Sequence, residues 1–405
     1  MKKFIMYGAG NIGRGFIGPT FSQSGYSVGF VDINMEVIDR LNVDKKYPVD
    51  VVCGDDVKEQ IISNVYGIDG KDIELVANEI ASCDVLATAI GVNVLKFIAK
   101  PIAEGLKKRF EQKRPPLNII ICENMIGADA YLKGLIKEQI PEYSSNIDKE
   151  IGFVEASIGR MVPSLSEEKR KGNPLRVAVE PYNILPVDKD SFKADMSDVK
   201  NLYPYAPFSL FIERKLFMHN MSHALTAYLG NLKGYEYIYQ AIADYDIRYA
   251  ALRALNQSAQ AVSKENGAEI GLLLSHAENL LYRFTNKALG DTVERVGKDT
   301  ARKLGANDRM IGAIKLCEKH NVNCEFICLG VAFAMFFAPE SDQSSKELKR
   351  YAEENGALKT LEKYSQYKGE NANLIAVLYN KLKEGKTVGD LIDYCDEISG
   401  KEIRV

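Results

Sequence analysis

The first half of the chain alternates short apolar runs with segments whose apolar positions recur at helical spacing. Runs that are apolar throughout indicate strands buried on both faces, and helices between them indicate parallel pairing. We therefore expect a parallel sheet with helices on both faces. The predicted strands cover 2–8, 26–32, 83–89, 117–122, 149–154 and 175–180, and the first predicted helices cover 11–24 and 35–42.

The pattern changes after about residue 205, where strand signals stop and long helical stretches begin. A chain of 405 residues is longer than one hydrophobic core usually serves, so two domains are expected. Pro204 and Pro207 mark the change and suggest a hinge. We predict an α/β domain over 1–204 and a mostly α-helical domain over 205–405. The predicted helices of the second domain cover 213–230, 235–264, 267–289 and 308–320.

A glycine-rich turn, YGAGNIGRGFIG, follows the first predicted strand and opens the first predicted helix. Gly8, Gly10 and Gly13 have the GxGxxG spacing, with Asn11 and Ile12 in the same turn. In that pattern the first glycine permits the tight turn and the second lets the backbone approach a pyrophosphate. The third allows close packing, and the helix N-terminus faces the phosphates. The order strand, glycine turn, helix therefore predicts a dinucleotide site in a Rossmann-type doubly wound sheet.

An acidic residue, Asp32, ends the second predicted strand, about twenty residues after the glycine turn. A carboxylate there binds ribose hydroxyls and repels a 2′-phosphate, so NAD is expected rather than NADP. Gly91 follows the predicted strand 83–89, at the end where doubly wound sheets bind ligands. It is a cofactor-binding candidate, and a simple turn glycine explains it equally well.

Composition and charge exclude several classes of partner. The net charge is -3, so neither a broad nucleic-acid surface nor a basic membrane face is expected. No apolar stretch is long enough to span a bilayer. Seven scattered cysteines are typical of reduced thiols in a cytoplasmic protein.

One cluster, formed by Cys317, His320, Cys324 and Cys328, is close enough in sequence to suggest zinc. However, it has no CxxC pair and lies in a largely apolar segment, so buried free thiols are the favoured interpretation over a zinc site.

The segment RKLFMHNMSHALTAYLG, residues 214–230, places polar side chains on an apolar helix. At about 100° per residue, Lys215, His219, Asn220 and His223 share one broad face. Burying them costs free energy unless each finds a partner, and a helix that lines a ligand cleft avoids that cost. A zinc site on the histidine pair is disfavoured, because there is no HExxH glutamate and no obvious third ligand.

Proton transfer by a lysine is the other chemistry open to this face. Oxidation of an alcohol by NAD requires a base for the hydroxyl proton, and a desolvated lysine beside a cationic nicotinamide can act near neutral pH. An asparagine can stabilise the developing oxyanion. From the residues alone, a structural helix with Lys215 at the surface and His223 hydrogen-bonded in the core remains open.

Several stretches together resemble the polyol-specific long-chain dehydrogenase/reductase (mannitol dehydrogenase) family. The signature KLFxxNxxHAxTAYLG carries the resemblance, with GAGNIGRGFIG, VDIN, TAIGVNVLKFIAKPIAEGL, CENM, GNPLRVAVEPYN and DTVERVGKDTARKL in collinear order. These matches cover most of the chain. The resemblance implies a Rossmann domain followed by a helical substrate domain, and chemistry without a metal.

The resemblance also implies roles for individual residues. Lys215 would be the general acid and base, Asn220 and Asn124 the oxyanion-binding pair, and His223 a contact to substrate hydroxyls. His219 matches nothing in the family signature.

A second set of residues would bind the substrate by resemblance. Arg295 and Lys303 would be cationic substrate contacts, by a looser alignment. The family's aspartate before R-x-x-P is replaced by Gly159, and Ile126 follows CENM where an arginine is often found. These departures leave the exact substrate open.

The expected function is NAD-dependent interconversion of a sugar alcohol and its ketose, with D-mannitol 1-phosphate and fructose 6-phosphate as the expected pair. The same chemistry on a non-phosphorylated polyol or a hexuronate stays open, as does a non-catalytic NAD-sensing protein. We expect a small-molecule substrate, no nucleic acid or membrane partner, and a monomer or small homo-oligomer.

Overall fold

The computed structural model describes residues 1–400 and divides into two compact units. The first unit is Met1–Phe208 and the second is Ser209–Val405, of which 401–405 lie outside the described residues. The change of pattern along the sequence predicts this boundary at 204/205. The two units are treated separately below.

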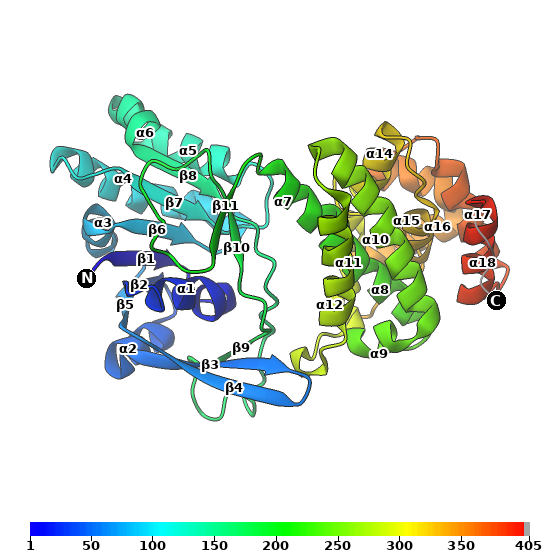
Figure 1. The fold of residues 1–405 in the computed structure, drawn as a ribbon, viewed down its shortest axis with the longest axis horizontal. Helices are drawn as coiled ribbons and strands as arrows, with labels where there is room; N and C mark the ends of the chain where they lie inside the picture. Colours follow the sequence, from blue (N-terminus) through cyan, green and yellow to red (C-terminus); the bar gives the residue numbers. More distant parts are fainter. Residues whose placement is uncertain (401–405) are drawn as a thin grey trace. The chain divides into compact units, whose positions relative to one another are not determined.

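The first unit is built on a six-stranded sheet in which all strands are parallel (Figure 1). The strand order is β5-β2-β1-β6-β7-β8, which is the order of a Rossmann-type doubly wound sheet. The order reverses between β1 and β6, and ligands bind at such a switch point beyond the carboxyl ends of the strands. The strands are β1 (Lys3–Tyr7), β2 (Ser27–Asp32), β5 (Val65–Asp69), β6 (Val85–Thr88), β7 (Leu117–Ile121) and β8 (Ile151–Glu155).

Helices cover both faces of this sheet, which confirms the predicted fold class. Along β1, Phe4 and Met6 belong to one buried cluster while Ile5 and Tyr7 belong to the other. This alternation follows from the two-residue period of a strand, and because both faces are buried the run reads as continuously apolar. The helices are α1 (Gly18–Ser22), α2 (Met35–Asp44), α3 (Ile73–Ser82), α4 (Leu95–Glu111), α5 (Ala128–Gln139) and α6 (Ser144–Glu150).

The sequence pattern does not predict five of the strands, which are β3, β4, β5, β10 and β11. Of these, β5 lies in the main sheet and the other four lie in two small sheets. β3 (Lys46–Cys53) and β4 (Asp56–Ser63) form a hairpin, and β9 (Val177–Val179) pairs with β3 in parallel. The apolar run 175–180 thus supplies a strand of this small sheet, not of the main one. β10 (Leu185–Asp188) and β11 (Leu202–Tyr205) pair separately. β4 is mostly exposed and rich in charged residues, so its sequence lacks the apolar run of a buried strand.

The second unit is mostly α-helical, as predicted (Figure 1). α8 (Met221–Leu232) lies at its centre, packed against α9 (Ile238–Ala243), α10 (Tyr245–Asn266), α12 (Val293–Gly297) and α15 (Glu325–Ala334). The remaining α-helices are α7 (Ser209–Glu213), α11 (Ile270–Phe284), α13 (Thr300–Lys303), α14 (Ile311–Lys319), α16 (Gln343–Thr360), α17 (Ala372–Lys383) and α18 (Val388–Ile398).

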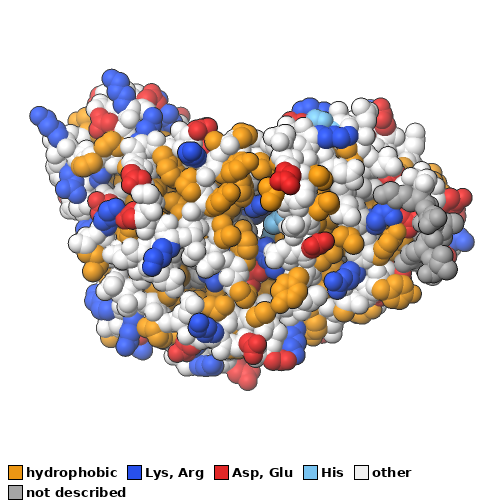
Figure 2. Space-filling view, viewed as in Figure 1, with side chains coloured by type: hydrophobic (Ala, Val, Ile, Leu, Met, Phe, Trp, Pro, Cys, Tyr) orange, Lys and Arg blue, Asp and Glu red, His pale blue; other side chains and the backbone are white. Residues whose placement is uncertain are grey.

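Surface and thiol features agree with the composition. The visible face carries both signs of charge interspersed with apolar side chains (Figure 2). Within residues 1–400, no helix combines the length and apolarity needed to cross a membrane. Over the same residues the cysteines form no disulfide, and Cys317, Cys324 and Cys328 are buried, as expected for structural thiols. His320 contacts Glu265, with 2.6 Å between Nε2 and Oε2.

Candidate cofactor site and active-site residues

The glycine turn after β1 is held by contacts that exclude a side chain at two positions. Gly8 has φ +109°, and a Cβ on it would lie 2.5 Å from the carbonyl oxygen of Ala89. A Cβ on Gly13 would lie 2.1 Å from the carbonyl oxygen of Gly8. Gly10 differs, because a Cβ there would meet no atom within 4 Å. The space beside Gly10 is therefore open to a ligand, as a turn that cradles a pyrophosphate requires.

The helix that follows the turn begins with a π-helical segment, η1 (Gly13–Ile17), where a continuous α-helix over 11–24 was expected. Arg14 is buried and turned back onto the loop, with Nε donating to the Ala9 carbonyl at 2.6 Å. Asn11 Nδ2 donates to Ser164 Oγ at 3.3 Å, and Ile12 packs against the core cluster of this face. The loop is thus fixed by its own neighbours.

Asp32 at the end of β2 lies beside the glycine turn. Its Oδ2 accepts a hydrogen bond from the Ala9 backbone N–H at 2.8 Å, and its Oδ1 accepts from Asn34 at 3.0 Å. The carboxylate is partly exposed at the edge where the second strand ends. This is the position from which an acid reaches the ribose hydroxyls of a dinucleotide.

Glu123, which we did not single out from the sequence, organises the turn after β6. Its Oε1 accepts from the Ile90 N–H at 3.0 Å and its Oε2 from the Gly91 N–H at 2.8 Å. Gly91 has φ +90° and open space at its Cβ position. The sequence does carry a signal for this contact. Glu123 is the second residue after β7, and the carboxyl ends of the parallel strands β6 and β7 lie at the same edge of the sheet. Asn124, the next residue, is exposed.

In the second unit, the residues from Arg214 to Asn220 form a π-helix, η4, between α7 and α8. The prediction of one regular α-helix over 213–230 was wrong here. In a π-helix the backbone bonds join residues five apart, so Lys215 and Asn220 come more nearly into line than at 100° per residue. Ser258 Oγ of α10 donates to the Phe217 carbonyl at 2.8 Å, which gives that carbonyl a partner from outside the helix. Such segments are frequent at functional sites.

His223 lies on the first turns of α8 and faces a carboxylate. Its Nε2 is 3.0 Å from Oδ2 of Asp291, within ion-pair distance although not aligned as a hydrogen bond. The ring also stacks on Phe284, with 4.7 Å between centroids and 17° between planes. These contacts fix both the position and the plane of the imidazole.

Asp291 bridges His223 to Arg295, and it too was missed from the sequence. Its Oδ1 accepts from the Arg295 guanidinium, with Nε at 2.6 Å. Burial alone raises the pKa of the Asp291 carboxyl, but His223 and Arg295 outweigh burial and the pKa lies below its ordinary value. Asp291 is 9% exposed, while the Arg295 side chain is 60% exposed. The carboxylate therefore holds an inner imidazole and an outer guanidinium together.

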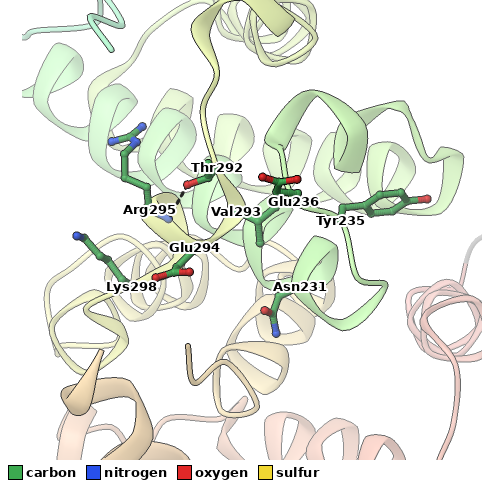
Figure 3. A pocket seen from close by; sticks show the side chains of 8 residues that line it. All are labelled: Asn231, Tyr235, Glu236, Thr292, Val293, Glu294, Arg295 and Lys298. Carbon is green, nitrogen blue, oxygen red and sulfur yellow. Dashed lines mark hydrogen bonds between the residues drawn. The ribbon is translucent and has the colours of Figure 1, made fainter. Parts of the chain in front are cut away.

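Arg295 also borders a pocket of about 500 Å³ that lies wholly in the helical unit (Figure 3). Lys298 and Arg295 lie at one end of it and Tyr235 at the other. Glu236 and Glu294 also line it, so the pocket carries charges of both signs.

Lys303, the other predicted substrate contact, is turned into the protein. It is 5% exposed, and its Nζ donates to the backbone carbonyls of Val296 and Lys298, at the end of α12. Burial, with Arg309 and Arg302 nearby, lowers the pKa of Lys303 to about 7. In this structure the lysine caps α12.

His219 is buried beside the stacked His223 and Phe284 rings, with 6.0 Å from its ring centroid to each of theirs. Burial and the nearby Arg283 hold its pKa well below the ordinary range. His276 on α11, a further histidine that we did not single out, has its pKa lowered to about 3 by burial and by Arg214. Within residues 1–400, no group of three or more His, Cys, Asp or Glu side chains is placed to hold a metal ion.

Comparison with known proteins gives the same two-part division. Residues 2–201 match the Mannitol dehydrogenase Rossmann domain and residues 208–393 match the Mannitol dehydrogenase C-terminal domain. The chain belongs to the mannitol dehydrogenase family. It is therefore a polyol-dehydrogenase-type oxidoreductase, and its Rossmann domain carries the fingerprint of an NAD site.

Relatives of this family member are found among both sequences and structures. A mannitol-1-phosphate 5-dehydrogenase from Thermoanaerobacter pseudethanolicus is 35% identical over 387 residues, 95% of this chain and 98% of that protein. One from Caldanaerobacter subterraneus subsp. tengcongensis is 35% identical over 367 residues, 89% of this chain and 93% of that protein.

Two solved structures share the fold at low sequence identity. A D-sorbitol dehydrogenase has a TM-score of 0.79 at 15% identity, covering 94% of this chain and 93% of that one. Pseudomonas fluorescens mannitol 2-dehydrogenase, in a complex with NAD and D-mannitol, has a TM-score of 0.76 at 16% identity, covering 99% and 95%.

The residues of this mannitol dehydrogenase family member fit a bound dinucleotide. Gly10 leaves open space on the turn, Gly8 and Gly13 keep the backbone close, and Asp32 sits at the ribose end. A cofactor there would be held by backbone N–H groups and by the Asp32 carboxylate.

Two glycine substitutions should separate folding from cofactor binding. Gly10→Ala should leave the free energy of unfolding unchanged but weaken NADH binding by about tenfold, because the methyl group enters open ligand space. Gly13→Ala should lower the free energy of unfolding by about 1–3 kcal/mol, because its Cβ overlaps the Gly8 carbonyl. Denaturant unfolding and NADH fluorescence titration measure the two effects.

Gly134→Ala is the matched control, since Gly134 is a helical glycine on α5 with open space at its Cβ position. It should bind NADH normally. Normal NADH affinity in Gly10→Ala would contradict the placement of the pyrophosphate.

Asp291→Asn should destabilise the protein in a pH-dependent way. The native pKa of Asp291 is lowered, so its carboxylate contributes stability above the ordinary aspartate pKa of about 3.9 and loses it as pH falls through the native value. We expect the variant to be less stable by about 1–3 kcal/mol at about pH 7, and the difference to shrink at about pH 3. Urea unfolding of both proteins measures this, and a difference independent of pH would contradict it.

Proposed function

We propose that the protein interconverts a sugar-alcohol phosphate and its ketose phosphate with NAD, with D-mannitol 1-phosphate and fructose 6-phosphate as the substrate pair. The observation that carries the proposal is the single segment η4–α8, which presents Lys215, Asn220 and the anchored His223. The two relatives named mannitol-1-phosphate 5-dehydrogenase, 35% identical along nearly the whole chain, support the phosphorylated substrate.

Lys215 is the proposed acid and base. A bound NAD would supply the hydride acceptor for the secondary carbinol carbon. Lys215 receives the hydroxyl proton in the oxidation direction and returns it to the oxygen when the ketose is reduced. Lys215 lies in the π-helical segment η4, and such segments are frequent at functional sites.

Asn220 and Asn124 are proposed to stabilise the oxygen that carries the developing negative charge. Side-chain amides that donate to an oxyanion lower the barrier for its formation. Asn220 lies one residue before α8, in the same π-helical turn as Lys215, and Asn124 follows Glu123 in the first unit. That the two act as a pair is part of the proposal.

His223 and Arg295 are proposed to bind the rest of the substrate. The imidazole, held by Asp291 on one side and Phe284 on its face, has one nitrogen left for a substrate hydroxyl. Arg295, 60% exposed at the pocket rim, is suited to the charged end of a sugar phosphate. Lys303 is proposed to act on the substrate only through α12, since its ammonium is used by two backbone carbonyls.

The reaction so described needs no metal, because Lys215 supplies the base and the amides supply oxyanion stabilisation. The competing proposal, a zinc-dependent dehydrogenase on His219 and His223, makes a different prediction. Turnover that survives prolonged treatment with a strong chelator supports the lysine mechanism, and turnover restored only by added zinc supports the metal.

Replacing Lys215 by alanine should lower kcat for fructose 6-phosphate reduction by about 10²–10⁴-fold, the usual contribution of a general acid or base. NADH affinity should be unchanged, because the cofactor residues lie in the other unit. NADH oxidation followed by absorbance gives kcat, and fluorescence titration gives the affinity.

Lys319→Ala, which removes an exposed lysine on α14, is the matched control and should keep wild-type turnover. Wild-type activity in Lys215→Ala would remove its assigned role. Wild-type protein that reduces fructose or a hexuronate but not fructose 6-phosphate would move the substrate to the non-phosphorylated class. NADH binding without turnover of any polyol or ketose would favour a sensor.

A further inference from the structure

A single carboxylate lies between the two side chains that are proposed to hold opposite parts of the substrate. Asp291 Oδ2 is 3.0 Å from His223 Nε2, and Asp291 Oδ1 accepts from the Arg295 guanidinium. His223 comes from the central helix α8 and Arg295 from α12, which packs against α8. The carboxylate contacts both side chains directly.

The backbone around Asp291 is itself held in place. Its carbonyl accepts from the Ile238 N–H at 2.9 Å, and the Val293 N–H donates to the Glu236 carbonyl at 2.9 Å. Thr292 caps α12 by accepting from the Arg295 N–H at 3.2 Å. Both ends of the Asp291–Arg295 segment are therefore anchored by hydrogen bonds. This holds the Asp291 carboxylate at a fixed position beside His223.

The contact also decides which imidazole nitrogen remains for a ligand. Nε2 of His223 is buried, and in the described part of the chain Asp291 is the charged group within reach of it. Because Nε2 faces the carboxylate, the proposed contact to a substrate hydroxyl is assigned to Nδ1. A carboxylate that orients a functional histidine in this way typically sets its tautomer and ring orientation.

We infer that Asp291 is a positioning residue that fixes the spacing between the hydroxyl-binding imidazole of His223 and the anion-binding guanidinium of Arg295. The inference rests on the proposed function for its kinetic consequences. It gives the enzyme a fixed distance between the reacting part and the charged end of a linear substrate, and that distance is a basis for selecting substrate length.

A double-mutant cycle on Asp291 and Arg295 tests this coupling. We compare wild type, Asp291→Asn, Arg295→Gln and the double variant for KM and kcat of fructose 6-phosphate reduction. Asp291→Asn should lower kcat/KM about 10–100-fold, in the range seen when a histidine loses its orienting carboxylate. Arg295→Gln should cost much less in the Asp291→Asn background than in wild type, because Asp291 no longer holds the guanidinium.

Asp308→Asn is the matched control, since Asp308 also pairs with two arginines of this unit, Arg302 and Arg309, away from His223. It should leave kcat/KM near wild type. Single-variant effects that simply multiply in the double variant would overturn the inference, as would an equal loss in Asp308→Asn. Asp291→Glu, which keeps the charge, should recover more activity than Asp291→Asn, and no recovery would count against positioning.

A second readout does not depend on turnover. The chain has four histidines, so selective ¹⁵N-histidine labelling gives few ring signals. Variants in which one histidine at a time is replaced by glutamine assign each signal to its residue. Asp291→Asn should shift the ring nitrogen signals of His223 and leave those of His320 unchanged, because His320 pairs with Glu265 elsewhere. Unchanged His223 signals overturn the positioning role. If the wild-type protein turns over no polyol phosphate, only the proposed function is contradicted, because the ring-nitrogen signals still test the positioning role of Asp291.

Discussion

The helical unit depends on one constraint: its central helix is buried on nearly all sides and yet carries polar side chains that need partners. The hydroxyls of Ser222 and Thr226 donate hydrogen bonds to backbone carbonyls one turn earlier, in η4 and α8. His223 faces the carboxylate of Asp291. An unpartnered polar group in such a place costs free energy. Asp291, just before α12, thus contacts both His223 of α8 and Arg295 of α12.

Carboxylates also hold polar groups at the carboxyl edge of the parallel sheet. There they accept hydrogen bonds from backbone N–H groups, whereas Asp291 faces an imidazole. Asp32 accepts from the turn after β1, and Glu123 accepts from the turn after β6. Both carboxylates hold loops at the switch point of the sheet, where backbone donors would otherwise lack partners. Gly8 and Gly13 are then required because the loops approach closer than any side chain allows. In each unit, a carboxylate that the sequence does not single out holds part of the candidate site. Glu123 holds the turn at Ile90 and Gly91, and Asp291 holds the imidazole of His223.

What the sequence could predict follows from the kind of signal it carries. Buried parallel strands such as β1 and β7 are almost wholly apolar, so the sequence predicts them, whereas it does not predict the mostly exposed strand β4. Hydrophobic periodicity indicates a helix but not its hydrogen-bond register, so the π-helix η4 could not be distinguished from an α-helix. Asp291 contacts His223 only through tertiary packing of α12 on α8. Lys303 matched a family pattern, but only the fold reveals that its ammonium caps α12.

The paired histidines illustrate how far spacing can mislead. Two histidines four residues apart on a helix can chelate a metal ion, but these two make different polar contacts. His223 is committed to Asp291, and His219 is buried beside Phe284 with its pKa far below the ordinary range. The proposed mechanism instead uses the spacing of Lys215 and Asn220, five residues apart in the π-helical turn, with His223 following on the first turn of α8.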